Sequence, residues 1–262
     1  WYDCTPMSNL EPSCHLYLSP HFDDAVFSCG GRIRRQARSR ERVTVVTVFG
    51  GALDPGAPLS PYAQQLHDRW GRSDAVQQRR TEDVEALTLL GAEPIHWPYL
   101  DCIYRRTPEG DFPYPSEGAL WGDVHASDAV MIEALTHRIR TLPLASGGRL
   151  YAPLGVGEHV DHRIVRRAAE GSGQPLTYYE DFPYAQDPQA VRAALTPGRW
   201  ESDLVLLSEH SLRAKVAAIA CYRSQISTFW GSQDAVNATV RAFAEQTGRG
   251  DPAERYWRSV GP

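Results

Sequence analysis

The stretch HLYLSPHFDDAVFSCGGRIRRQ, residues 15–36, shows how the fold is expected to begin. Residues 15–19 form a short apolar run and are predicted to be a strand. Residues 25–36 are predicted to be a helix, because Val26 and Ile33 fall roughly on one face at helical spacing. The polar residues between the two elements therefore lie at the carboxyl end of the strand.

The same alternation of short apolar runs and helical patterns continues along the chain. Further strands are predicted at 42–49, 94–97, 149–152, 176–180 and 204–207, and further helices at 77–90, 127–142, 162–170, 208–223 and 232–246. This order predicts an α/β fold: a three-layer, Rossmann-like sandwich with a mostly parallel sheet and helices on both faces. In such folds, ligands bind beyond the carboxyl ends of the strands.

Three long loops interrupt this pattern, at residues 50–72, 101–126 and 182–203. Loops of this length inside a compact domain are usually functional or disordered. We expect them to line the active site and to select the substrate. Aromatic faces suit sugar rings, and the loops and their flanks offer Trp70, Tyr99, Tyr104, Phe112, Tyr114, Trp121, Tyr179, Phe182, Tyr184 and Trp200.

Length and composition fit a single domain over residues 1–262, with 42% hydrophobic and 23% charged residues. The formal net charge of -5 predicts no nucleic-acid partner. No apolar run of about 18 residues occurs, so no membrane span is expected, and residues 1–12 do not resemble a secretory signal. The five cysteines are scattered without a CxxC pair, so we expect free thiols in a cytoplasmic protein. Nothing in the sequence predicts an oligomeric state.

Residues 18–25 (LSPHFDDA) place His21 beside the adjacent carboxylates of Asp23 and Asp24. Two buried carboxylates repel each other and lose hydration, so they need a cation or a shared proton. A zinc ion meets that need, because His and Asp are both normal zinc ligands. The purely structural alternative is that one of the aspartates caps the helix and interacts with its dipole.

A second polar segment, residues 155–162 (GVGEHVDH), follows the predicted strand 149–152 in the same sense, from strand end into helix. Both segments therefore project from the same edge of a parallel sheet. If the two strands are close, His21, Asp24 and His162 converge and provide two nitrogens and one oxygen. Three protein ligands leave positions for water and substrate, which is the pattern of a catalytic zinc site.

These segments resemble the paired signatures of the PIG-L/LmbE-like family of zinc-dependent N-deacetylases. SPHFDDA at 19–25 is similar to the family's PHPDDE, and HVDH at 159–162 is similar to its HxDH. RRTE at 79–82, followed by LLG, resembles the family's RxxE helix, and the segment 215–225 (KVAAIACYRSQ) resembles its K…HRSQ helix. The resemblance covers about residues 16–226, and four motifs in the same order make it specific.

The resemblance implies that one zinc ion per chain is held by His21, Asp24 and His162, with ferrous iron as the alternative metal. It makes Asp23 the general base. An amide carbonyl is a poor electrophile and neutral water is a poor nucleophile, but zinc lowers the pKa of its water to near 7 and polarises the carbonyl. A carboxylate next to the metal can then take the proton of that water.

The remaining polar residues of the motifs receive roles from the same resemblance. His159 is implied to stabilise the developing oxyanion or to protonate the leaving amine. Asp161 is implied to orient a histidine, as a carboxylate behind a ligand normally does. Arg79 and Asp101 are implied to hold the substrate, although Glu82, one helical turn after Arg79, is an alternative partner for that guanidinium.

The sequence departs from the family's pattern at four positions. Phe22 replaces a common Pro and Ala25 replaces a Glu, but neither is an implied metal ligand. Gly157 stands two residues before His159, where some members place a Tyr that assists the oxyanion, so any such help must come from elsewhere. Tyr222 replaces the His of HRSQ, which puts the role of that position in doubt.

Members of this family act on N-acetylglucosamine units attached to different carriers. The implied reaction is therefore the metal-dependent hydrolysis of an N-acetyl or other N-acyl group, and the implied partner is a small-molecule N-acetylamino-sugar conjugate. With its aromatic loops, the sequence is most similar to deacetylases of secondary metabolism that act on glycopeptide pseudoaglycones. A deacetylase or amidase of thiol-cofactor synthesis is the alternative within the family.

Three alternatives lie outside this reaction. His159, Asp161 and another His could form the iron facial triad of an oxygenase, but that site usually needs an all-β barrel. A non-catalytic sugar-binding relative would need no base beside the ligands, and Asp23 supplies one. A nucleotide-binding protein would need GxGxxG after a strand, whereas the glycines at 29–31 (CGG) fall inside a helical pattern.

Overall fold

A seven-stranded sheet organises the computed structural model, which describes residues 13–54, 56–70 and 75–260. Its strands are β1 (Ser13–Ser19), β2 (Val43–Thr47), β3 (Glu93–His96), β4 (Leu144–Pro153), β5 (Leu176–Tyr179), β6 (Trp200–Leu206) and β7 (Ala253–Ser259). They stand in the order β3-β2-β1-β4-β5-β7-β6. The first five in this order are parallel to one another, whereas β7 runs antiparallel to both β5 and β6.

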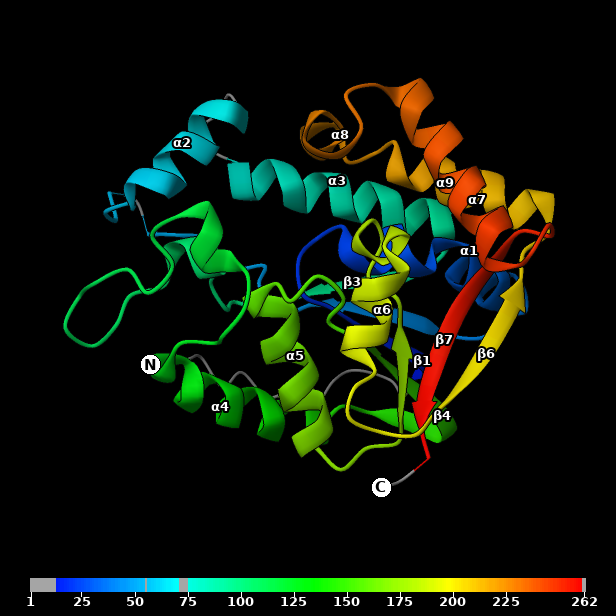
Figure 1. Ribbon diagram of the computed structural model, residues 1–262, viewed down its shortest axis with the longest axis horizontal. Coiled ribbons are helices and arrows are strands. Elements are labelled where there is room, and N and C mark those ends of the chain that lie inside the picture. Colours follow the sequence, from blue (N-terminus) through cyan, green and yellow to red (C-terminus); the bar gives the residue numbers. More distant parts are fainter. Residues whose placement is uncertain (1–12, 55, 71–74, 261–262) are drawn as a thin grey trace.

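Helices cover both faces of this sheet (Figure 1). They are α1 (Asp24–Arg38), α2 (Pro61–Trp70), α3 (Ala75–Leu90), α4 (Ala129–Arg140), α5 (Val160–Gly171), α6 (Pro188–Ala194), α7 (Glu209–Ile219), α8 (Arg223–Phe229) and α9 (Gln233–Thr247), with 3₁₀ helices η1 (Cys102–Tyr104), η2 (Glu117–Leu120), η3 (Ala126–Asp128) and η4 (Tyr184–Gln186). α1, α3, α7 and α9 pack over one face, and α4 and α5 pack over the other. The predicted three-layer α/β sandwich with a mostly parallel sheet is confirmed. None of the described helices is both long and apolar enough to cross a membrane.

The core is divided between the two faces because successive side chains of a strand point to opposite sides of the sheet. On β1, Tyr17 packs in the apolar cluster that contains Val26 and Ile33 of α1. Its neighbours Leu16 and Leu18 pack in the cluster beneath α4 and α5. β1 is therefore buried on both faces, as a central strand of a parallel sheet should be.

Two of the three predicted loops contain a helix, so the expectation of irregular structure there is wrong in part. α2 lies within the predicted loop 50–72, where the Ser60 hydroxyl accepts a hydrogen bond from the Ala63 N–H (3.0 Å). α6 lies within the predicted loop 182–203 and is capped in the same way by Asp187. In both helices a proline follows the capping residue, and this combination favours a helix start.

The loop predicted at 101–126 is irregular apart from η1 and η2. Together with α2, these short helices bury a small apolar cluster of their own, apart from the two cores of the sheet. Residues 55, 71 and 72, which belong to the first predicted loop, lie outside the described residues. The long segments after β2 and β3 thus form one packed wall at the carboxyl edge of the sheet.

The C-terminal strands differ from the prediction. β6 begins at Trp200 instead of residue 204, and β7 was not predicted at all. The two strands pair antiparallel from Trp200 opposite Ser259 to Leu206 opposite Ala253. Both strands are short and rich in charged residues, so neither has the apolar pattern that indicates a strand. Their pairing depends on tertiary contacts.

The helix predicted to run from Ser208 to 223 is interrupted. α7 ends at Ile219, and α8 begins at Arg223, after a turn of three residues (220–222) that contains Tyr222. The Tyr222 side chain is wholly buried and its hydroxyl donates a hydrogen bond to Asp83 of α3 (2.7 Å). We attribute the break to this contact, because the backbone at Tyr222 leaves the helical region (φ -82°, ψ 60°).

Candidate active site

The turn between β1 and α1 positions the first polar segment. The Ser19 hydroxyl donates a hydrogen bond to the His21 carbonyl (2.6 Å) and accepts one from the Ala25 N–H (3.0 Å). The His21 N–H in turn donates to the Asp24 carboxylate (2.7 Å). These bonds fix the turn so that His21, Asp23 and Asp24 are all buried at the carboxyl end of β1.

The segment between β4 and α5 positions the second group. β4 is the parallel neighbour of β1, so the two strand ends lie side by side, as the sequence predicts. Gly155 and Gly157 adopt positive φ angles (79° and 87°) in the loop that leads to α5. His159 then caps that helix, because its Nδ1 accepts a hydrogen bond from the Asp161 N–H (3.3 Å).

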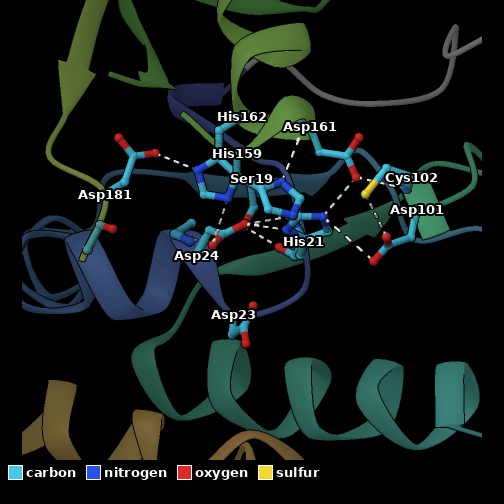
Figure 2. A network of polar contacts seen from close by, with 12 residues as sticks. Ser19, His21, Asp23, Asp24, Asp101, Cys102, His159, Asp161, His162 and Asp181 are labelled. Carbon is cyan, nitrogen blue, oxygen red and sulfur yellow. Dashed lines mark hydrogen bonds and ion pairs between the residues drawn. The ribbon is translucent and has the colours of Figure 1, made fainter. Parts of the chain in front are cut away.

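The three residues expected to bind metal come together at this edge (Figure 2). His21 Nδ1 lies 3.2 Å from Asp24 Oδ2, and His162 Nε2 lies 3.3 Å from Asp24 Oδ1. Ligand atoms around one zinc ion, with bonds of about 2.0–2.2 Å and tetrahedral angles, are separated by about 3.3–3.6 Å. Nitrogens of His21, His159 and His162 also lie within 4.8 Å of one another, so the geometry suits a metal ion.

The charges of this cluster stabilise one another. Burial alone raises the pKa of Asp24, but His162 and His21 lower that pKa well below its usual value. Burial opposes protonation of His162, yet Asp24 and Asp181 raise its pKa to about 10. Such strong mutual stabilisation shows that the carboxylate carries its negative charge and that the site favours positive charge around it.

Asp23 has a different environment from its neighbour. Figure 2 shows it apart from the linked residues of the cluster, and Arg79 Nη2 lies 3.6 Å from its Oδ1. Burial raises the pKa of Asp23 to about 6, an effect that Arg79 opposes and Asp24 reinforces. A carboxylate with this pKa is ionised at neutral pH and is still basic enough to accept a proton.

Asp161 is placed to orient a histidine, as the sequence suggests. Its Oδ2 accepts a hydrogen bond from His21 Nε2 (3.0 Å) and another from the Cys102 N–H (3.0 Å). Its Oδ1 pairs with Arg105 Nη1 (2.7 Å). Although burial raises the pKa of Asp161, Arg105 and His21 together hold it well below its usual value, so it remains an anion that fixes the imidazole ring of His21.

Two residues of the site were not foreseen. Asp181 accepts a hydrogen bond from His162 Nδ1 (2.7 Å), which directs the opposite ring nitrogen toward Asp24. Asp181 follows the end of β5, so the rule that singled out His21 after β1 could have found it. Arg105 gives no such signal, because it lies in an irregular segment with no motif around it.

Asp101 lies at the rim of the cluster. Its Oδ2 is 3.6 Å from His21 Nε2, and its Oδ1 accepts a hydrogen bond from the Ile103 N–H (3.2 Å). Together with Arg79 and Tyr104 it lines a small pocket beside the cluster. The two residues expected to contact the substrate, Arg79 and Asp101, are therefore brought to one pocket.

The two helical motifs, RRTE and CYRSQ, interlock behind this pocket. Glu82 accepts hydrogen bonds from the Ser224 N–H (3.1 Å) and from the Ser224 hydroxyl (2.6 Å). The next residue, Asp83, accepts the hydrogen bond of Tyr222 (2.7 Å). Glu82 therefore ties α3 to α8.

Few of the aromatic residues expected to face a sugar do so. Core positions with at most 4% exposure are held by Tyr99, Tyr104, Tyr114, Tyr179 and Phe182. The side chain of Trp70 lies outside the described residues. Trp121 is 38% exposed and its ring centroid is 5.1 Å from that of His159, while the half-buried Tyr184 lies 6.0 Å from His162. Of the expected aromatic side chains that the structure describes, Trp121 and Tyr184 therefore lie beside the two histidines, and Tyr104 lines the small pocket.

A larger cavity of about 490 Å³ opens between α5 and α6. It reaches the loop before His159, where Gly157 and Glu158 line it, but no side chain of the His/Asp cluster does. The chemistry is assigned to the cluster, because His and Asp side chains with strongly shifted pKa values converge there at the carboxyl ends of the strands.

Fold and site together define an α/β protein whose strand ends assemble a His/His/Asp cluster fit for a metal ion, with a separate carboxylate beside it. Residues 16–171 match the family model described as PIG-L, GlcNAc-PI de-N-acetylase. This match covers more than half of the chain, and the protein belongs to that family.

The chain is similar over most of its length to several deacetylases. It is 27% identical over 241 residues to 2'-N-acetylparomamine deacetylase from Niallia circulans, covering 86% of this chain and 85% of that protein. The zinc-inhibited form of teicoplanin deacetylase matches with a TM-score of 0.80 and 29% identity, covering 95% of this chain and 98% of that one. The A40926 pseudoaglycone deacetylase matches with a TM-score of 0.74 and 29% identity over 96% and 98%. The resemblance to secondary-metabolite deacetylases is confirmed.

Proposed function

We propose that this protein is a zinc-dependent N-deacetylase that hydrolyses the N-acetyl group of an amino sugar in an antibiotic intermediate. The observation that carries the proposal is the position of Asp24 between His21 and His162, with Asp23 beside them but outside the cluster. The names of the relatives support the substrate class, since they act on 2'-N-acetylparomamine, teicoplanin and the A40926 pseudoaglycone.

The donor set suits zinc. Two imidazole nitrogens and one carboxylate, with room for a further ligand, are the usual protein ligands of a catalytic zinc ion. Asp181 holds the Nδ1 proton of His162, so Nε2 is the nitrogen that would give up its proton and bind the metal ion. A zinc ion bound by these residues would lower the pKa of a water molecule and polarise the acetyl carbonyl. A relative is known in a zinc-inhibited form, so zinc interacts with at least one protein of this kind, there as an inhibitor.

The protein's own groups account for the proton transfers. Asp23 accepts a proton from the attacking water, and Arg79 holds the carboxylate in place. His159 Nδ1 accepts from the Asp161 N–H, so the ring proton is on Nε2, and this N–H can donate a hydrogen bond to the developing oxyanion without losing its proton. Asp23 then passes its proton to the amide nitrogen as the C–N bond breaks. The products are acetate and the free amine.

The alternatives have less support. An iron oxygenase site of the kind considered above belongs to all-β barrels, and this fold is a three-layer α/β sandwich. A non-catalytic sugar-binding protein would have no use for a buried carboxylate with a raised pKa beside the cluster. None of the relatives described above is named for thiol-cofactor synthesis.

The experiment that tests the proposal uses purified, zinc-loaded protein and three acetylated conjugates: 2'-N-acetylparomamine, an N-acetylglucosaminyl glycopeptide pseudoaglycone and N-acetylglucosaminyl inositol. Mass spectrometry should detect acetate loss from one of the first two. Asp23→Asn should keep its zinc, because no ligand is removed, while turnover falls by about 10²–10⁴.

The exposed Asp111→Asn serves as the matched control, with unchanged zinc content and turnover. Near-normal turnover of Asp23→Asn would move the base elsewhere. Hydrolysis of none of the three conjugates by wild-type protein would reject the proposed substrate class, and preference for the inositol conjugate would favour the thiol-cofactor alternative.

A further inference from the structure

Phe22, between His21 and Asp23 in the sequence, has a buried ring that lines the small pocket together with Arg79 and Asp101. The guanidinium of Arg79 lies over the face of this ring, with Cζ 5.6 Å from the ring centroid. The face of an aromatic ring is negative and attracts a cation at such a distance. Phe22 therefore contacts the same guanidinium that lies 3.6 Å from the carboxylate of Asp23.

Arg79 has two tasks in the proposed reaction, and both depend on where its guanidinium lies. It stabilises the carboxylate of Asp23, and it lines the pocket that is expected to receive the substrate. The separation of its Nη2 from Asp23 Oδ1, 3.6 Å, is longer than a charge-assisted hydrogen bond of about 2.7–2.9 Å. This ion pair does not by itself fix the plane of the guanidinium, whereas a flat ring beneath the guanidinium restricts its tilt.

A second ring holds Phe22 in position. The imidazole of His96, at the end of β3, lies edge-on to it at 5.2 Å. His96 Nε2 is hydrogen-bonded to the buried carboxylate of Asp83 (2.7 Å), which also accepts a hydrogen bond from the Tyr222 hydroxyl (2.7 Å). The backbone of Gly50 encloses both rings, because a Cβ atom there would lie 3.2 Å from His96 Cβ and 3.5 Å from Phe22 Cε1. The ring of Phe22 therefore has little freedom to move.

Two departures from the family's pattern thus belong to one chain of contacts. Phe22 stands where Pro is common, and Tyr222 stands where the family has His. A Pro side chain at position 22 would not extend beneath Arg79, and it would leave the ring of His96 without its aromatic partner. The contacts run from Tyr222 through Asp83 and His96 to Phe22, and they end on the guanidinium of Arg79.

We propose that Phe22 is a positioning residue, whose ring fixes the guanidinium of Arg79 between the base Asp23 and the substrate pocket. The proposal rests on the proposed deacetylation, because Phe22 acts there only through Arg79. The side chain of Arg79 is mostly buried, and a cation–π contact is stronger in such surroundings than at an exposed site. Without the contact, the guanidinium can tilt away from both partners, so that substrate binding and proton transfer weaken together.

The test replaces Phe22 with phenylalanines that carry one, two or three fluorine atoms on the ring. Fluorine withdraws electron density from the ring face and weakens its attraction for a cation, while the shape of the ring changes little. We expect kcat/KM to fall stepwise, by about 2–30-fold over the series, which is the range of a cation–π contact. In Phe22→Leu, which lacks the ring face, kcat/KM should fall at least as far. Zinc content should stay unchanged, because no ligand is removed.

The substrate-free protein gives a second readout. In ¹⁵N–¹H spectra, the Nε–H signal of Arg79, identified by its loss in Arg79→Gln, should move with each added fluorine, because the guanidinium lies over the ring. The signal should move furthest in Phe22→Leu. If Phe22 only supported the fold, fluorination would leave both this signal and kcat/KM unchanged.

The same series at Phe112 is the matched control, because its ring carries the guanidinium of Arg106 at 5.4 Å and neither residue lines the small pocket. There, kcat/KM and the Arg79 signal should keep their wild-type values. The proposal is overturned if kcat/KM stays constant along the Phe22 series, or if it falls while the Arg79 signal does not move. A wild-type protein that hydrolyses no acetylated amino sugar would refute the proposed function, whereas the Arg79 signal would still report whether Phe22 positions the guanidinium.

Discussion

The adjacent aspartates Asp23 and Asp24 have different surroundings and therefore different pKa values, because of the backbone geometry at the start of α1. Successive residues of a helix are rotated by about 100°, so the two carboxylates at the start of α1 leave it in different directions. Asp24 meets two imidazoles, which lower its pKa well below its usual value. Asp23 meets a single guanidinium at 3.6 Å, and burial keeps its pKa near 6. One is thereby suited to hold a cation and the other to accept a proton.

Asp181 gives a prediction at the same scale. It fixes the ring of His162 through a hydrogen bond of 2.7 Å to Nδ1, so Asp181→Ala should free the ring to rotate and to change tautomer. We expect zinc affinity to weaken by about 10–100-fold, as for other carboxylates behind a metal ligand. Competition with a chromophoric chelator measures this change.

Asp187→Ala is the control, since Asp187 caps α6 through the Gln189 N–H (2.8 Å) and is exposed. Its zinc affinity should equal that of the wild type. Equal affinities in Asp181→Ala and wild-type protein would mean that packing alone orients His162.

At the scale of elements, α1 depends on groups from the C-terminal part of the chain. The N–H groups of Gly31 and Arg32, in the middle of this helix, donate to the carboxylate of Glu254 on β7 (both 2.9 Å). Lys215 of α7 donates to the Ser28 carbonyl (3.0 Å) and to Glu254 (2.8 Å). The buried ion pair of Lys215 and Glu254 therefore hydrogen-bonds to the middle of α1, the helix that begins with Asp24.

Glu254→Ala should destabilise the protein strongly. It would leave Lys215 as a buried charge without its partner and would remove the carboxylate that accepts from two helix N–H groups, and breaking a buried pair in this way costs about 3–5 kcal/mol. Urea denaturation followed by circular dichroism should show the loss as a lower midpoint. Glu85→Ala, which removes a largely exposed pair with Arg223, should shift the midpoint little. Similar midpoints for the two variants would contradict this account.

At the scale of the whole molecule, the strand order assembles the site. β1 lies between β2 and β4, and β5 follows β4. The residues after β1, β4 and β5 consequently meet at one carboxyl edge, which brings His21, His162 and Asp181 together. Because these strands are buried on both faces, the platform beneath the site is rigid.

Zinc binding should stabilise this assembly as a whole. A ligand that binds only the folded state at 100 times its Kd contributes about 2.7 kcal/mol. Scanning calorimetry should therefore show a higher Tm with zinc than with a chelator, and elemental analysis should find one zinc per chain. In Asp24→Asn the difference in Tm should shrink markedly, because a ligand is lost. A wild-type Tm that does not respond to zinc would argue against a metal site built from these residues.

Much of this protein could be predicted from local patterns. The polar segments after residues 15–19 and 149–152 gave the metal-ligand candidates and the base, and the alternation of strands and helices gave the three-layer fold. The site prediction succeeded because a parallel sheet places the carboxyl ends of its strands along one edge, independently of the conformation of the loops. The start of α2 at Ser60-Pro61 carries a local signal of the same kind.

The tertiary structure decided the rest. Glu254 contacts a helix more than 200 residues away, Arg105 reaches Asp161 from an irregular segment, and Tyr184 occupies the space left by Gly157. None of these pairs has a periodic spacing that could reveal it. The sequence by itself determined which residues stand at the strand ends, because local backbone geometry depends on near neighbours. Which side chains support them depends on strand order and loop paths, and those follow from packing over the whole chain.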